Sequence, residues 1–245
     1  MVKNLQLAAC CKTDPGLLRS HNEDVCLANV EQRYFMVADG MGGSAGGEVA
    51  SALFQKVASE VFSIDNHLSF EESLARVKGC FTLANTKILD QATDNPVLAG
   101  MGCTAELLTF HGNMFVLGHV GDSRTYRFYD NTLEQITKDH SFVQQQLDRG
   151  DISKSQAEKS RFKNILLQAV GTTSRLTVDV TSGQVLPATL FLLCTDGLHS
   201  MIAENEIEPV LNFDAPLDLK AEMLVNMAND AGGKDNISVT LVEVL

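Results

Sequence analysis

Short apolar runs in this chain repeatedly meet an acidic residue that stands beside glycine or asparagine. The four segments are residues 35–40, 116–122, 192–197 and 232–236. A fifth acidic pair, Glu23-Asp24, precedes another short apolar run. Strands of one sheet can bring such ends together, and a carboxylate at the point where strand pairing stops is exposed to a common cleft. The pattern therefore predicts several carboxylates around one cleft, where they would repel one another strongly unless cations neutralised them.

The residue types in these segments favour hard divalent cations. Carboxylate, backbone carbonyl and water oxygens suit Mg²⁺ or Mn²⁺, and a glycine after the aspartate lets a backbone carbonyl approach the ion. Zinc is disfavoured because the six histidines show neither HxxxH nor HExxH spacing. A single Asp-Gly pair is usually only a turn. Four such sites at strand ends favour a metal site over four unrelated turns.

The hydrophobic periodicity predicts an α+β fold. Apolar residues at helical spacing predict two long amphipathic helices over about 49–61 and 70–88, and further helical stretches are expected at about 140–159 and 216–230. Runs rich in branched and aromatic residues predict strands at 34–38, 103–110, 114–120, 125–129, 189–194 and 237–244. A hairpin through His111-Gly112-Asn113 makes the sheet antiparallel there. Helices that come in blocks argue against a doubly wound parallel sheet.

Composition sets limits on the class of protein. A chain of 245 residues with 44% hydrophobic residues is expected to form a single domain, residues 1–245, that is soluble and cytoplasmic, because it shows neither a membrane-length apolar stretch nor a secretory signal. The formal net charge of −12 argues against nucleic acid as a substrate. The six cysteines include no CxxC pair and are expected to be buried and reduced.

A polar segment at 148–171 is the least regular part of the chain. It carries Gly150 and several serines, which predicts an excursion over the surface. With the helical stretch before it, the segment defines a flap subregion at about 140–171 that would lie over a substrate.

An ordered series of motifs resembles the PPM (PP2C-type) metal-dependent Ser/Thr protein phosphatases of the stand-alone bacterial type. The motifs are Arg19-x-x-Asn22-Glu23-Asp24, Val37-Ala38-Asp39-Gly40-Met41-Gly42-Gly43, Gly47-Glu48-x-Ala50-Ser51, Gly102-Cys103-Thr104-Ala105, Gly118-His119-Val120-Gly121-Asp122-Ser123-Arg124, Thr137-x-Asp139-His140-Ser141, Cys194-Thr195-Asp196-Gly197-Leu198 and Asp235-Asn236-Ile237-Ser238. They run in the family's order from about residue 13 to the end. A lone Asp-Gly would be weak evidence, but this series covers nearly the whole chain.

The resemblance implies a four-layer αββα sandwich of two antiparallel sheets flanked by helices. It implies hydrolysis of phosphoserine and phosphothreonine on proteins by a hydroxide that bridges two Mn²⁺ or Mg²⁺ ions, with a third ion in bacterial members. Phosphorylated proteins and a cognate Ser/Thr kinase are the implied partners, with no nucleic acid and no membrane, and the chain is expected to be a monomer.

The family's site residues map onto this sequence one by one. Asp39, Asp196 and Asp235 match the catalytic metal ligands, with Asp39 bridging the two ions, and the carbonyl of Gly40 matches a further ligand. Asp122 matches the ligand of a third metal. Three further positions complete the set: Glu23 and Asp24, which match residues that bind metal through water, and Arg19, which matches the phosphate-binding arginine.

Two departures from the family pattern leave alternatives open. Many members have histidine as leaving-group acid where this chain has Met41, and methionine cannot donate that proton. Many also have Thr-Arg where this chain has Leu167-Gln168, so the anchoring of the flap is open. Asp122 has an alternative role in holding a turn. At the level of the whole protein the alternatives are a catalytically weak regulatory member that binds phosphoproteins, and a metal nuclease on another fold.

Overall fold

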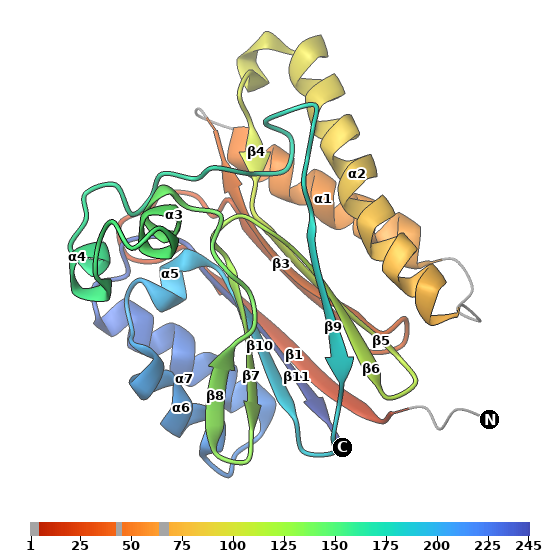
Figure 1. Cartoon of the computed structure of the whole chain (residues 1–245), viewed down its shortest axis with the longest axis vertical. Coiled ribbons are helices and arrows are strands. Elements are labelled where there is room, and N and C mark those ends of the chain that lie inside the picture. Colours follow the sequence, from red (N-terminus) through yellow and green to blue (C-terminus); the bar gives the residue numbers. More distant parts are fainter. Residues whose placement is uncertain (1–4, 43–45, 64–68) are drawn as a thin grey trace.

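The strands of this protein form two sheets in which every pairing is antiparallel, as seen in a computed structural model that describes residues 5–42, 46–63 and 69–245 (Figure 1). The first sheet has the order β1 (Leu7–Asp14), β11 (Ile237–Val244), β10 (Leu190–Cys194), β7 (Arg124–Tyr129) and β8 (Thr132–Gln135). The second has the order β2 (Asp24–Asn29), β3 (Tyr34–Met41), β5 (Ala105–His111), β6 (Met114–Val120) and β9 (Asp179–Gln184), with the short β4 (Gly102–Cys103) paired to β3.

The two sheets pack face to face over an apolar layer. Its aromatic side chains interlock in edge-on and tilted contacts, with ring centroids 5.2–5.9 Å apart, between Phe35, Phe110, Phe115 and Phe191. Alternate residues of each strand point into this layer, because successive side chains of a strand face opposite sides of the sheet. Each sheet therefore has a second face that helices must cover.

Helices α1 (Gly46–Phe62) and α2 (Phe70–Asp94) cover the outer face of the second sheet (Figure 1). Ser69 and Glu72 form a capping box that starts α2 by satisfying amide groups left free in its first turn. The two helices contact each other through Phe54 and Phe81, whose rings are 5.0 Å apart. Both rings are fully buried, which is the reason for the apolar helical spacing in the sequence.

The outer face of the first sheet is covered by α5 (Asp196–His199), α6 (Glu204–Asn212) and α7 (Leu217–Asp230). Two further helices, α3 (Phe142–Asp148) and α4 (Lys154–Glu158), stand together at one edge of the molecule (Figure 1). The layers are thus helix, sheet, sheet and helix, which confirms the expected αββα sandwich. No helix in the described part of the chain is long and apolar enough to cross a membrane.

The sequence-based assignment of elements needs three corrections. The strand expected at 103–110 is interrupted at Thr104, where β4 ends and β5 begins one residue later. The helical stretch expected at 140–159 is two short helices separated by Gly150, which has φ +72° and so favours a break. The strands β1, β2, β8 and β9 and the helices α5 and α6 were not among the expected elements. The hairpin between β5 and β6 is confirmed, with His111 paired to Met114.

Candidate active site

A cleft of about 250 Å³ opens at one end of the sandwich, where β3, β6 and β10 end and β2, β7 and β11 begin. Because neighbouring strands are antiparallel, one edge of the molecule collects the ends of some strands and the beginnings of others. The lining residues are Arg19, Glu23, Asp39, Gly40, Met41, Gly42, Thr104, Asp122, Asn164, Leu166, Asp196, Asp235 and Asn236. Five carboxylates and one guanidinium therefore share this cleft.

Thr104 fixes the position of Asp39 at the end of β3. The backbone N–H of Asp39 donates to the Thr104 hydroxyl at 3.1 Å, and the N–H of Thr104 donates to the Asp39 carbonyl at 2.9 Å. The Thr104 hydroxyl also bonds the hydroxyl of Ser123 at 2.6 Å. The break between β4 and β5 is thus the place where a threonine leaves strand pairing to hold the neighbouring aspartate.

Gly40 lies where the chain has no room for a side chain. A Cβ added there would be 2.1 Å from the carbonyl oxygen of Gly47, at the start of α1. The Gly40 N–H donates to the Glu23 carbonyl at 3.1 Å, and the Ser51 hydroxyl donates to the same carbonyl at 2.6 Å. This close approach of β2, β3 and α1 explains why glycine follows Asp39.

Asn236 connects the C-terminal motif to the N-terminal one. Its amide nitrogen donates to the carbonyls of Pro15 and His21, both at 2.9 Å, and its amide oxygen accepts from the Glu23 N–H at 2.8 Å. Residues more than 200 positions apart in the sequence are therefore fixed beside each other. Asp235 precedes Asn236 and is placed in the cleft by the same contacts.

Arg19 is held against Asp235 on the open side of the cleft. Its Nη2 donates to Asp235 Oδ2 at 2.7 Å, while Asp235 Oδ1 accepts from the N–H of Asn236 at 2.9 Å. Just over half of the Arg19 side chain is exposed. The ion pair raises the pKa of Arg19 further above its ordinary value. Arg19 therefore stays charged and keeps donors free toward the solvent.

Asp24 is placed beneath the cleft and does not line it. It is buried, pairs in register with Asp39 across β2 and β3, and accepts a hydrogen bond from the Thr195 hydroxyl at 2.7 Å. Thr195 itself is fixed by Ser238, whose N–H donates to the same hydroxyl at 3.0 Å. Burial raises the pKa of Asp24 to about 7, against these hydrogen bonds, which lower it.

Asp122 lies on a loop held by its neighbours. His199 Nε2 donates to the Asp122 carbonyl at 2.9 Å, and the Arg124 guanidinium binds both oxygens of Asp139 at 2.9 and 2.8 Å. Burial, followed by repulsion from Asp196, raises the pKa of the Asp122 carboxyl to about 8. The loop is therefore held through the Asp122 carbonyl, and Asp122 lines the cleft.

Asp196, Asp39 and Glu23 have pKa values that are perturbed in the same direction. Burial raises the pKa of Asp196 to about 6 and that of Asp39 well above its ordinary value, with Asp24 and Asp196 adding to the effect on Asp39. Burial also raises the pKa of Glu23. Burial and mutual repulsion disfavour the ionised forms of these three carboxylates, so positive charge in the cleft would stabilise those forms.

These residues fit divalent cations because they are carboxylates and because two of their buried oxygens have no hydrogen-bond partner. One oxygen of Asp24 and one of Asp196 are buried without a hydrogen-bond partner in the described structure, and such oxygens require a partner. In residues 5–42, 46–63 and 69–245, no three carboxylate, imidazole or thiolate groups surround one point closely enough to hold an ion alone. Ions here would complete their coordination with water and the Gly40 carbonyl, as Mg²⁺ commonly does.

Most of the expected site residues therefore meet in one place. Arg19, Glu23, Asp39, Gly40, Asp122, Asp196 and Asp235 all line the cleft, and Asp24 lies under it. The supporting roles of Thr104, Thr195 and Asn236 were not predicted. Their motifs were visible in the sequence, but a hydroxyl or amide gives no sign of which distant group it will bind.

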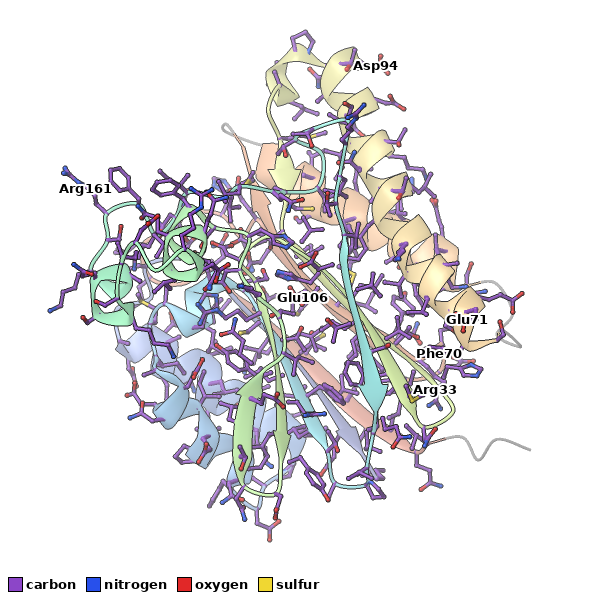
Figure 2. All side chains as sticks on the ribbon, in the orientation of Figure 1. Arg33, Phe70, Glu71, Asp94, Glu106 and Arg161 are labelled. Atoms are coloured by element: carbon purple, nitrogen blue, oxygen red, sulfur yellow. The ribbon has the colours of Figure 1, made fainter. Side chains whose placement is uncertain are left out.

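A buried network joins the second sheet to the start of the expected flap. Glu106 lies at the centre of the molecule (Figure 2) and pairs with Nδ1 of His119, while its other oxygen accepts from the Thr125 hydroxyl at 2.7 Å. His119 Nε2 donates to the carbonyl of Lys138 at 2.9 Å. The next ring, that of His140, is 4.5 Å from His119 between centroids. This network was not predicted from the sequence.

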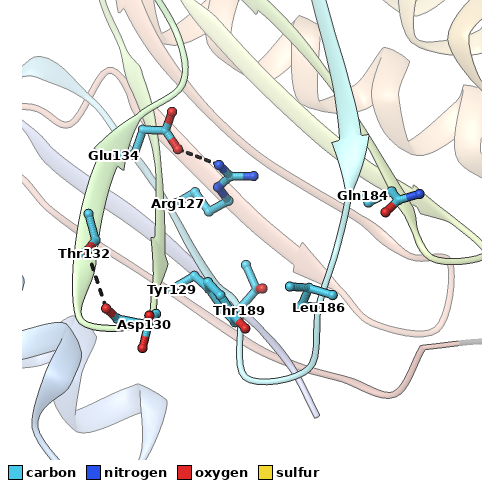
Figure 3. Close-up of a pocket in the computed structure, with 8 residues that line it drawn as sticks. All are labelled: Arg127, Tyr129, Asp130, Thr132, Glu134, Gln184, Leu186 and Thr189. Atoms are coloured by element: carbon cyan, nitrogen blue, oxygen red, sulfur yellow. Dashed lines mark hydrogen bonds and ion pairs between the residues drawn. The ribbon is translucent and has the colours of Figure 1, made fainter.

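A second hollow, of about 390 Å³, lies near the far ends of β7 and β9 (Figure 3). Its one arginine, Arg127, is paired with Glu134 at 2.5 Å, and its other acidic residue is Asp130. It therefore contains neither a cluster of carboxylates nor an unpaired guanidinium. The smaller cleft at the opposite end of β7 remains the candidate active site.

Comparison with known proteins identifies the family. The family model for protein phosphatase 2C matches residues 19–241. The serine/threonine phosphatase stp of Listeria welshimeri is 38% identical over 236 residues, which is 95% of this chain and 94% of the relative. The crystal structure of the Mycobacterium tuberculosis serine/threonine phosphatase PstP superimposes with a TM-score of 0.91 at 32% identity, over 97% of this chain and 98% of that one.

A second solved structure, the PstP catalytic domain in complex with two manganese ions, gives a TM-score of 0.90 at 32% identity, over 99% of this chain and all of that one. Both the family match and the superposition span the strands whose ends form the cleft. The chain belongs to the protein phosphatase 2C family.

Proposed function

We infer that this protein is a metal-dependent protein phosphatase that hydrolyses phosphoserine and phosphothreonine. The observation that carries the inference is the cleft in which Arg19 lies among five carboxylates, at the end of both sheets. Two relatives that are 38% and 34% identical to this chain are named serine/threonine phosphatases. A nucleic-acid substrate is opposed by the net charge of −12.

Two Mn²⁺ or Mg²⁺ ions are proposed as the cofactor, in line with the two manganese ions bound by the PstP catalytic domain. The residues proposed to hold them are Asp39, the Gly40 carbonyl, Asp196 and Asp235, with Glu23 and Asp24 acting through water. Asp122 is proposed, with Asp196, for a third ion. When bound, such ions make water acidic enough to attack near neutral pH and offset charge on the phosphoryl oxygens.

Arg19 is proposed to bind and orient the phosphoryl group. Its planar guanidinium has five N–H donors, of which the structure uses one on Asp235. The remaining donors face the open side of the cleft and match two phosphoryl oxygens at once. Because Arg19 also contacts Asp235, a phosphoryl group bound by Arg19 would lie beside the carboxylate cluster.

The proton for the leaving oxygen must come from a group other than residue 41. Met41 lines the cleft at the position where many family members have histidine, and its thioether has no proton to donate. Asn164 and Leu166 close the cleft on the side of the flap and limit the access of water to the reacting group. We propose residues 140–171 as a flap of the single domain.

The substrates are proposed to be phosphoproteins made by a Ser/Thr kinase, with the enzyme acting as a monomer. The test is hydrolysis of an aryl phosphate and of a phosphothreonine peptide, with Mn²⁺ and with a chelator. Activity that needs Mn²⁺ and is lost in Asp196→Asn, but kept in the matched surface variant Asp90→Asn, is the expected result. A folded protein that binds phosphopeptide without turnover, or that cleaves DNA instead, would overturn the proposal.

A further inference from the structure

The flap carries a charge opposite to that of the rest of the molecule. Residues 149–163 contain five basic side chains against two acidic ones, in a chain whose formal net charge is −12. No ion pair among the described side chains involves any of the five, Arg149, Lys154, Lys159, Arg161 and Lys163. Unpaired cations gathered on one segment favour an acidic partner.

The C-terminal part of this basic segment runs directly into the active site. Asn164 and Leu166 line the cleft, and Lys163 precedes them. Lys163 is close enough to Asp196 to lower the pKa of that carboxyl, although burial raises it more. Arg161 lies farther out, at the outer edge of the flap (Figure 2). The cations therefore extend outward from the cleft along the flap.

The backbone after Lys163 is held in place, so its exposed side chains form a fixed surface. The N–H of Phe142 donates to the Ile165 carbonyl at 2.8 Å, and the N–H of Leu167 donates to the His140 carbonyl at 2.7 Å. Ile165 and Leu167 are nevertheless 46% and 45% exposed. Apolar side chains held outward beside an active site are typical of a surface that a partner covers.

Aromatic contacts shape the outer part of the same surface. Phe162 is 45% exposed and packs edge-on against Phe142, with ring centroids 6.1 Å apart. The Arg161 guanidinium lies over the Phe162 ring at 5.6 Å, which orients its charge. The flap edge at 159–167 thus combines three cations with three exposed apolar side chains.

A loop beside the cleft carries exposed apolar side chains next to Arg19. Leu17 and Leu18, 66% and 71% exposed, precede Arg19 on a loop fixed by hydrogen bonds of 2.7 and 3.2 Å from their N–H groups to the Gly233 carbonyl. Lys234 adjoins the same loop beside Asp235, whereas the flap edge carries Lys159, Arg161 and Lys163, so the flap side holds the larger group of cations.

We propose that the flap edge at 159–167 docks phosphoprotein segments that carry acidic residues close to the phosphorylated residue, together with an apolar residue that covers Ile165 and Leu167 beside the cleft. This rests on the proposed phosphatase function. Lys163, next to the cleft-lining Asn164, would meet an acidic side chain close to the phosphothreonine, and Arg161 would meet one farther out. Charge complementarity favours this occupant, because a long polyanion would be repelled by the acidic remainder of the molecule.

The test compares hydrolysis of matched phosphothreonine peptides with Mn²⁺ present, Glu or Asp in one and Gln or Asn in the other. We expect kcat/KM to be about three- to tenfold higher for the acidic peptide, in line with one or two exposed ion pairs. The double variant Arg161→Gln/Lys163→Gln should bring this ratio to near one, and Lys78→Gln on α2 should leave it unchanged. Using the ratio within each variant cancels any change in overall activity.

The apolar contact has its own readout. Replacing Ser by Leu close to the phosphothreonine of the peptide should raise kcat/KM several-fold, and Ile165→Ser should remove that gain. Equal turnover of acidic and neutral peptides by the native enzyme, or a ratio that persists in the double variant, would overturn the docking proposal. In either case hydrolysis of a small aryl phosphate would show that the proposed function still stands, whereas its absence would refute that function itself.

Discussion

The buried pair between Glu106 and His119 should make the stability of this fold depend on pH above neutrality. The two side chains are 0% and 3% exposed, and their outer atoms are satisfied by the Thr125 hydroxyl and the Lys138 carbonyl. His119 fills both contacts as a donor only when it carries both protons. Burial alone would lower the pKa of His119, but the Glu106 carboxylate outweighs it and raises that pKa to about 9.

The direction of the effect follows from this raised value. Histidine in an unfolded chain titrates near pH ~6.5, so between ~6.5 and 9 the folded protein keeps a proton that the unfolded chain releases. The stabilisation is complete below the unfolded pKa and is lost as the pH rises through the folded one. One such proton changes the free energy of unfolding by up to about 1.4 kcal/mol per pH unit, or about 2 kcal/mol between pH 7 and 9.

The variant that tests this is Glu106→Gln. Its amide oxygen can accept from Thr125 and its amide nitrogen can donate to Nδ1 of a neutral His119, so the network stays connected without charge. Glu106→Leu leaves both groups without a partner and should cost about 3–5 kcal/mol. Burial also raises the pKa of Glu106. Glu106→Gln therefore removes two effects at once: the titration of Glu106 and the raised pKa of His119.

The assay is thermal unfolding at pH 7 and pH 9 with a fixed concentration of Mn²⁺, because the cleft carboxylates also titrate in this range. For a chain of this size about 2 kcal/mol corresponds to a fall of roughly 4–8 °C in Tm. The native protein should lose that much more than Glu106→Gln over the same interval. An equal loss in the two proteins would refute the charged pair.

Other predictions concern the cleft itself. Arg19→Lys should raise KM for a phosphopeptide about tenfold, because one of two charged hydrogen bonds is lost, with a smaller change in Mn²⁺ affinity; an unchanged KM would remove Arg19 from the site. Asp122→Ala should raise the Mn²⁺ concentration needed for half-maximal turnover, and an unaltered dependence would end the third-metal hypothesis. Gly197→Ala would put a Cβ 1.9 Å from the backbone oxygen of Asn236 and should cost about 3 kcal/mol, measured as a lower denaturation midpoint; no shift would mean that the backbone relaxes. In chelated protein, Tm should fall between pH 6 and 8, because the folded pKa values of Asp196 and Asp122 are raised to about 6 and 8 and a raised carboxyl pKa stabilises only below it. Mn²⁺ should then raise Tm more at pH 8 than at pH 6, and an equal shift at both would argue against binding by these carboxylates.

The parts of the fold that sequence reasoning found are those in which burial dictates residue type. The strand expected at 114–120 is β6 and that at 237–244 is β11, because nearly every residue of both is buried and therefore apolar or small. The strand β9 was missed because most of its residues are exposed, including Asp179 and Gln184. Its pairing comes from the free edge of β6, which local sequence does not encode.

The cleft carboxylates were predictable because their signal is local, whereas the residues that support them are selected by distant contacts. An aspartate between an apolar strand and a glycine stands out locally, as at Asp39 and Asp196. The partners that hold the cleft are set by tertiary contacts: Thr104 lies 65 residues from Asp39, and Thr195 lies 171 residues from Asp24. A threonine hydroxyl can serve a strand, a cap or a distant carboxylate equally well, so the sequence alone does not say which.

The cleft depends on the packing of the two sheets because neither sheet contains it alone. Asp39 lies near the end of β3 and Asp122 in the loop after β6, which are both strands of the second sheet, whereas Asp196 follows β10 and Asp235 precedes β11 in the first. These groups repel one another, so the energy that keeps them together comes from elsewhere, from the apolar layer between the sheets and from neutral donors such as Thr195. A loosened layer would let the carboxylates move apart before the strands separate. Affinity for divalent cations is therefore a property of the whole sandwich and not of any one motif.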